Sequence, residues 1–82
     1  MPLTAAEQDA RYVTLKDNEK RAIDNAMVYA SEGKYFEAIY TFVKDCERFG
    51  FSSNPLVLPI LQSYSTSPEY FREGLIGFFA MW

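Results

Sequence analysis

Between Gly33 and Phe49 the chain repeats apolar residues at spacings of three and four, which is the period of a helix with one buried face. This pattern predicts a helix over residues 34–49, followed by a glycine at position 50 that is suited to ending it. The residues predicted on its buried face are Tyr35, Ile39, Phe42, Cys46 and Phe49, with Phe36 and Val43 widening the face.

A second helix is predicted immediately before it, over about residues 15–31. Either Thr14 or Asp17 can cap its first turn, and Gly33 is suited to the left-handed residue that follows its end. Two helices joined by such a short turn are expected to pack as an antiparallel hairpin. The residues predicted on the buried side of this helix are Ala22, Ile23, Ala26, Met27, Tyr29 and Ala30.

The two ends of the chain carry their own helix-start motifs. Thr4 and Glu7 fit a capping box, which predicts a short helix through about Tyr12. Ser67 and Pro68 fit an N-cap followed by the first helical residue, which predicts a C-terminal helix over residues 68–81. Its apolar side is predicted to carry Phe71, Leu75, Phe78, Phe79 and Trp82, and Gly74 and Gly77 are expected where another backbone comes close.

The segment 55–64 is harder to interpret because Pro59 lies in its middle. A proline inside a helix lacks the N–H group that the preceding turn needs. The segment is therefore expected to be a helix that begins near Pro59 or one that bends there. A strand is the less favoured alternative, since proline is excluded from central pairing.

These elements predict one all-α domain spanning residues 1–82, a compact bundle of four to five short helices without a sheet. At 82 residues, a single core is only marginally sufficient for stability. Hydrophobic residues make up 49% of the chain and aromatic residues 17%, so the core is expected to be dense or completed by a partner.

Several residues of the predicted hairpin recur at a spacing known from a protein family: Ala26, Tyr29, Gly33, Tyr35, Glu37, Ala38 and Phe42. Over residues 22–50 they resemble the helical hairpin of the tetratricopeptide-repeat family. That family has small residues where the helices cross, a glycine turn and aromatic residues at fixed spacing. The resemblance implies a scaffold that binds peptides or partner domains. No second copy follows 34 residues later, and Ala22, Asn25, Asp45 and Gly50 depart from the family pattern.

The chemistry of the side chains does not favour an enzyme. The chain has no histidine, which removes the commonest general base and the commonest zinc ligand. The single cysteine, Cys46, falls within the apolar face and is expected to be buried and unreactive. Glu69 and Glu73 are interpreted as a solvated first helical turn rather than an acid–base or metal pair. No catalytic residue, metal or cofactor is therefore expected.

Charge is distributed unevenly. The formal net charge is −3, which argues against binding of phosphate backbones. Residues 49–68 and 74–82 carry no charged side chain. The 70–82 segment therefore has two open interpretations: a closing helix of the core, or an exposed surface that binds a partner or a second copy.

The sequence thus favours a small non-catalytic protein–protein interaction module, such as an adaptor, inhibitor or assembly subunit. No run is long enough to span a membrane, and neither a signal peptide nor a disulfide framework is expected, which favours a cytoplasmic protein. The alternative is a regulator that contacts nucleic acid through Lys16, Lys20 and Arg21. The candidate partner-binding residues are Phe71, Leu75, Phe78, Phe79, Met81 and Trp82.

Overall fold

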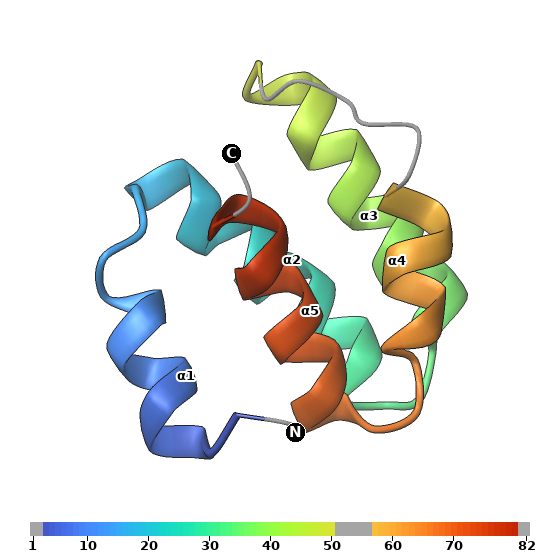
Figure 1. Cartoon of the computed structure of the whole chain (residues 1–82). Coiled ribbons are helices and arrows are strands. Elements are labelled where there is room, and N and C mark those ends of the chain that lie inside the picture. Colours follow the sequence, from blue (N-terminus) through green and yellow to red (C-terminus); the bar gives the residue numbers. More distant parts are fainter. Residues whose placement is uncertain (1–2, 51–56, 81–82) are drawn as a thin grey trace.

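The computed structural model of the chain describes residues 3–50 and 57–80, which fold into an all-α bundle (Figure 1). Five helices form, and no strand occurs within the two described ranges. This confirms the predicted fold class. The helices are α1 (Ala5–Tyr12), α2 (Asp17–Ala30), α3 (Tyr35–Arg48), α4 (Val57–Ser63) and α5 (Pro68–Ala80).

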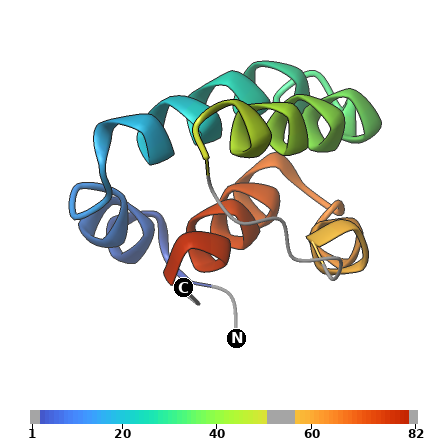
Figure 2. The same cartoon turned by 90° about the horizontal axis from the view of Figure 1, so that it is seen from above.

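The helices are arranged in two layers (Figure 2). Helices α2 and α3 lie side by side in one layer as the predicted hairpin, and α1, α5 and α4 form the other. The turn between α2 and α3 depends on Gly33, whose φ of 77° lies in the left-handed region. The amide of Lys34 then donates to the carbonyl of Tyr29, which closes the end of α2.

Local capping explains where the other helices begin. The Thr4 hydroxyl accepts from the Glu7 amide and the Glu7 carboxylate accepts from the Thr4 amide, which confirms the predicted capping box. The hydrogen bond from the Thr4 backbone also lowers the pKa of Glu7. At α5 the Ser67 hydroxyl accepts from the Tyr70 amide at 3.1 Å, as predicted.

The start of α2 differs from the prediction. Its N-cap is Lys16 rather than Thr14 or Asp17. The Lys16 amide donates to the Glu19 carboxylate at 2.8 Å. A side chain of the first helical turn therefore satisfies the backbone N–H of the N-cap residue. The Thr14 hydroxyl instead donates to the carbonyl of Arg11, at the end of α1.

The prediction of a helix that begins near Pro59 is confirmed over the described residues, because α4 begins at Val57, two residues before Pro59. Pro59 is therefore the third helical residue, within the first turn, where an amide has no partner inside the helix. The segment 57–63 is helical, which excludes the strand alternative over these residues. Residues 55 and 56 of the predicted segment lie outside the described residues.

The core lies between the two layers. Small side chains let α2 and α3 approach closely, since Ala22, Ala26, Ala30 and Ala38 are all fully buried. Helix α5 covers this hairpin. The remaining buried hydrophobic residues are Ile23, Ile39, Phe42, Cys46, Val57, Leu61, Phe71, Leu75, Ile76, Phe78 and Phe79.

Two residues predicted to lie on buried faces are exposed. Tyr29 has 38% of its surface exposed and Phe36 has 79%. The reason is that a helical pattern gives the centre of a buried face more reliably than its width. Gly74 and Gly77 also differ from the expected close backbone approach: a Cβ atom at Gly74 would meet the side chain of Tyr64, and one at Gly77 would meet nothing within 4 Å.

Candidate interaction surface on helix α3

Four of the six residues predicted to bind a partner are core residues in the structure. Phe71, Leu75, Phe78 and Phe79 are at most 7% exposed. Their rings pack into the hairpin: Phe42 lies 5.2 Å from Phe78 and 5.5 Å from Phe79 between ring centroids, in edge-on geometry. Helix α5 therefore closes the core, which is one of the two interpretations of this segment.

The other two predicted residues, Met81 and Trp82, lie outside the described residues. A binding role for them stays a prediction. Within the described ranges, exposed hydrophobic surface has to be sought on other helices.

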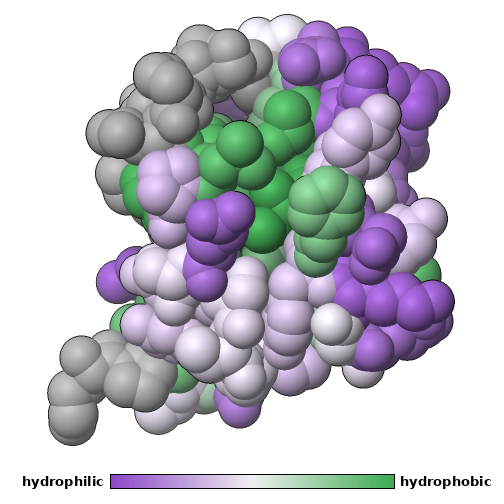
Figure 3. Space-filling view, turned by 90° about the vertical axis from the view of Figure 1, so that its right-hand side faces the viewer, coloured by the Kyte–Doolittle hydropathy of each residue, from purple (hydrophilic) through white to green (hydrophobic). Residues whose placement is uncertain are grey.

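The outward side of α3 carries two exposed aromatic residues. Phe36 is 79% exposed and Tyr40 is 58% exposed, and they lie one helical turn apart. Leu58 on the neighbouring helix α4 is 51% exposed. Figure 3 looks onto the side of the molecule where α3 and α4 lie and shows hydrophobic residues gathered in the middle of this face.

Charged residues accompany these rings on the same helix. Lys44 places its Nζ 5.5 Å from the centre of the Tyr40 ring, a cation–π contact. Glu37 and Glu47 are exposed. We define the α3 outer face as the exposed side chains that share this side of the helix: Phe36, Glu37, Tyr40, Lys44 and Glu47.

Sequence reasoning missed this face because it assigned Phe36 to the buried side and did not consider Tyr40. One feature of the sequence indicates this face. Tyr35, Ile39, Phe42 and Cys46 already fill a buried face, so further aromatic residues on α3 lie beyond that face and must meet solvent or a partner.

The basic residues proposed for nucleic-acid contact lie around the start of α2. Lys16 and Arg21 are exposed. Lys20 is half-buried, with its Nζ 5.8 Å from the centre of the Tyr12 ring. The Tyr12 hydroxyl in turn donates to the Asp24 carboxylate at 2.9 Å. Burial is the main cause that raises the pKa of Tyr12, and the hydrogen bond to Asp24 raises it further. An acidic residue therefore shares the region of the three basic ones.

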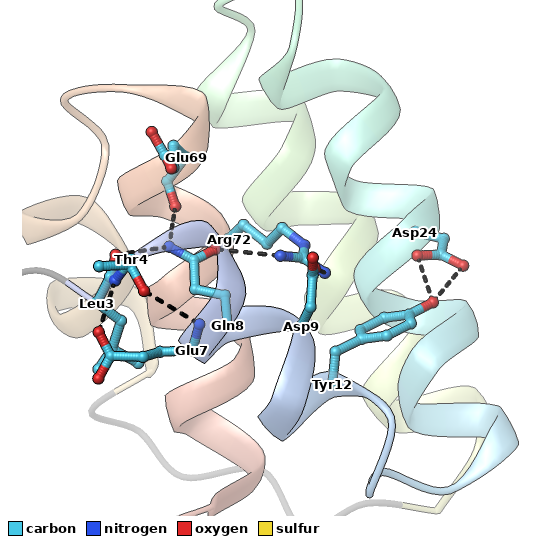
Figure 4. Close-up of polar contacts among 9 residues, drawn as sticks. All are labelled: Leu3, Thr4, Glu7, Gln8, Asp9, Tyr12, Asp24, Glu69 and Arg72. Atoms are coloured by element: carbon cyan, nitrogen blue, oxygen red, sulfur yellow. Dashed lines mark hydrogen bonds and ion pairs between the residues drawn. The ribbon is translucent and has the colours of Figure 1, made fainter.

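A polar network joins α1 to α5 (Figure 4). Gln8 is buried and is held from both sides: its Nε2 donates to the Glu69 carbonyl at 3.3 Å, and its Oε1 accepts from Arg72 at 3.2 Å. Arg72 also pairs with Asp9 at 3.0 Å. These polar side chains therefore have a structural role, which is to connect α1 to α5.

Glu73 departs from the predicted solvated turn. It is only 9% exposed, and its Oε1 accepts from the Leu3 amide. Its Oε2 is buried without a hydrogen-bond partner among the described residues. Glu69, in contrast, is exposed as predicted. The two carboxyl groups are thus placed differently, and Glu73 serves to fix the segment before α1.

An open depression of about 390 Å³ lies beside this network. It contains one carboxylate and several hydroxyl groups, and none of its lining residues is basic. The residues around it are Leu3, Gln8, Thr66, Ser67, Glu69 and Tyr70.

The remaining chemical candidate, Cys46, is buried at 4% exposure, which confirms the predicted buried thiol. Burial raises its pKa to about 11, and the nearby Asp45 and Glu47 carboxylates add to this increase. The thiol is therefore protonated at neutral pH and is a poor nucleophile. No three side chains of the His, Cys, Asp or Glu type come together as a metal site in residues 3–50 and 57–80.

Comparisons with known proteins identified no matching family, no similar curated protein and no similar solved structure. The resemblance to the tetratricopeptide-repeat hairpin stays a prediction. None of the helices in the described part of the chain has the length and apolar character needed to cross a bilayer.

Proposed function

We propose that the chain is a small non-catalytic protein–protein interaction module that binds its partner through the α3 outer face. The observation that carries this proposal is the exposure of Phe36 and Tyr40, two aromatic rings one turn apart on a regular helix. Aromatic residues are enriched at protein interfaces, and those at the centre of an interface often contribute most of the binding energy.

The position of these rings on a rigid element supports the proposal. Helix α3 is held on its inner side by the core through Ala38, Ile39 and Phe42, so its outer side chains project from a fixed backbone. A partner can then bind without first ordering this surface, which lowers the entropic cost of association.

The test is affinity capture by the full chain from cells that naturally produce it. The double variant Phe36→Gln and Tyr40→Gln removes both rings while keeping side chains that suit a helix. We expect it to lose proteins that the wild type retains. Val28→Gln is the matched control, because Val28 is 61% exposed on α2 and lies outside the proposed face.

Circular dichroism must show the same helical content in all three proteins. The proposal is contradicted when the double variant and the Val28 control both retain the same partners as the wild type. In that case the exposed rings of α3 take no part in binding.

A further inference from the structure

We propose that the partner is a second copy of this chain, bound by antiparallel pairing of the two α3 outer faces across a two-fold axis. This inference rests on the proposed function, since it names the occupant of the same surface. It is carried by the arrangement of opposite charges around the exposed rings of α3.

The five side chains of the α3 outer face lie on one side of the helix. Successive residues advance by about 100° around an α-helix, so Phe36, Tyr40 and Glu47 form one row along the face, and Lys44 and Glu37 form a second row beside it. Together they cover an arc of about 100° directed away from the buried side of α3. The exposure of Phe36 and Tyr40 shows that no helix of the described residues covers their rings.

The charges on this face are self-complementary in one orientation only. Glu37 and Lys44 are equally far from the point between Tyr40 and Thr41, and they have opposite signs. When two copies of α3 pair in antiparallel orientation about that point, Glu37 of each copy faces Lys44 of the other. Parallel pairing would instead bring Glu37 against Glu37 and Lys44 against Lys44, which is repulsive.

The two-fold axis forms this contact twice. Glu37 of the first copy faces Lys44 of the second, and Lys44 of the first copy faces Glu37 of the second, as an isologous interface requires.

The aromatic residues occupy the middle of this arrangement. Tyr40 lies next to the axis, so the two Tyr40 rings meet there, and Phe36 lies one turn away on each copy. The pairing would bury rings that are 58% and 79% exposed in the single chain. The result is an apolar centre flanked by charged pairs, which is the usual anatomy of a protein interface.

The charges required are available in the folded chain. Within the described residues, Glu37 and Glu47 form no ion pair. Lys44 lies over Tyr40 and stays on the outer face.

The length of α3 sets the expected strength of the dimer. Its 14 residues span about 21 Å, so the contact is at the small end of specific interfaces. We therefore expect a concentration-dependent dimer in rapid exchange with the monomer. Because its charges lie at the edge of the contact, raising the salt concentration should weaken it.

Sedimentation equilibrium of the purified full chain, from micromolar to millimolar concentration, tests the inference. We expect the wild type to shift from monomer mass towards dimer mass. Glu37→Lys and Lys44→Glu should each weaken self-association at least about tenfold, because each places like charges opposite one another. Arg21→Glu is the control for a change in charge, since Arg21 is exposed on α2, and it should leave association unchanged.

The decisive measurement is a mixture of the two weakened variants. In a mixed pair, the lysine introduced at position 37 faces the glutamate introduced at position 44, and the native Lys44 faces the native Glu37. Both contacts are attractive, so the mixture should associate as strongly as the wild type although neither variant does so alone. A defect in folding could not be corrected in this way.

A wild type that is monomeric throughout this concentration range overturns the inference, as does a mixture that fails to associate. The proposed function is judged separately by the Phe36 and Tyr40 double variant. When that variant loses a different protein that the monomeric wild type captures, the self-pairing is wrong and the proposed function stands. When it changes neither capture nor association, both are wrong.

Discussion

Gly74 lies so close to Tyr64 that a Cβ atom on residue 74 would be 2.7 Å from Cγ of the tyrosine ring. The contact joins α5 to the residue that follows α4, and it involves the fixed root of the ring rather than a flexible tip. The Tyr64 ring also packs against Tyr70, with the two ring centroids 4.5 Å apart. A glycine is therefore required here by space rather than by backbone conformation.

We expect Gly74→Ala to destabilise the fold by about 1–3 kcal/mol, because the new methyl group forces Tyr64 to move. Gly77→Ala, on the same helix, should instead stabilise it by up to about 1 kcal/mol, because nothing lies within 4 Å and alanine favours a helix. Urea unfolding of both variants measures the two effects. Changes of the same sign in both variants would contradict the proposed contact.

The buried Gln8 side chain should be important for holding α1 against α5. Gln8→Ala removes its three hydrogen bonds, and it leaves the Arg72 guanidinium without one of its partners. We expect a loss of about 1–3 kcal/mol in unfolding free energy. Amide hydrogen exchange should also accelerate more in α1 than in α3 when Gln8 is replaced. Gln62→Ala, an exposed glutamine on α4, is the control and should change stability by less than about 0.5 kcal/mol.

Asn25 and Asp45 connect the two helices of the hairpin through one hydrogen bond of 3.0 Å, from Asn25 Nδ2 to Asp45 Oδ2. Asp45 is only 8% exposed, so its carboxylate depends on this donor. Asn25→Ala should cost about 1–3 kcal/mol, because a buried charged acceptor loses its partner. Asn18→Ala, at an exposed site on the same helix, provides the comparison. Equal thermal stability of the two variants would show that Asp45 does not need Asn25.

Cys46 should make stability decrease at alkaline pH. Burial raises its pKa from 9.0 to about 11, so the folded chain holds the thiol protonated while the unfolded chain ionises it. The stability that the protonated thiol contributes is fully present below pH 9 and is lost as the pH rises towards 11. The difference in unfolding free energy between wild type and Cys46→Ala, measured across this window, isolates the effect. A pH-independent difference would contradict it.

The helix boundaries that could be predicted from sequence are those set by residues within one turn. Thr4 with Glu7, Gly33, and Ser67 with Pro68 act on adjacent backbone groups, so their effect does not depend on the rest of the fold. The start of α2 was not predicted correctly, because its N-cap residue, Lys16, does not use its own side chain. The Glu19 carboxylate instead accepts a hydrogen bond from the Lys16 amide.

The candidate surface could not be predicted because hydrophobicity alone does not distinguish a core residue from an interface residue. Phe78 and Phe36 are chemically identical, yet Phe78 packs against Phe42 while Phe36 is exposed. The difference depends on where α5 lies relative to α3, which is a tertiary relationship between segments far apart in the chain. Helical periodicity finds the centre of a buried face but not the angle at which burial ends.

The two-layer arrangement also has a consequence for the order in which the chain folds. Helices α2 and α3 are neighbours in sequence, so their hairpin closes only a short loop, whereas the contact of Gln8 with Glu69 spans 61 residues. Local contacts of this kind favour rapid folding. We therefore expect the alanine-lined hairpin to form early and to provide the surface on which α5 docks, and α1 to be added last and released first.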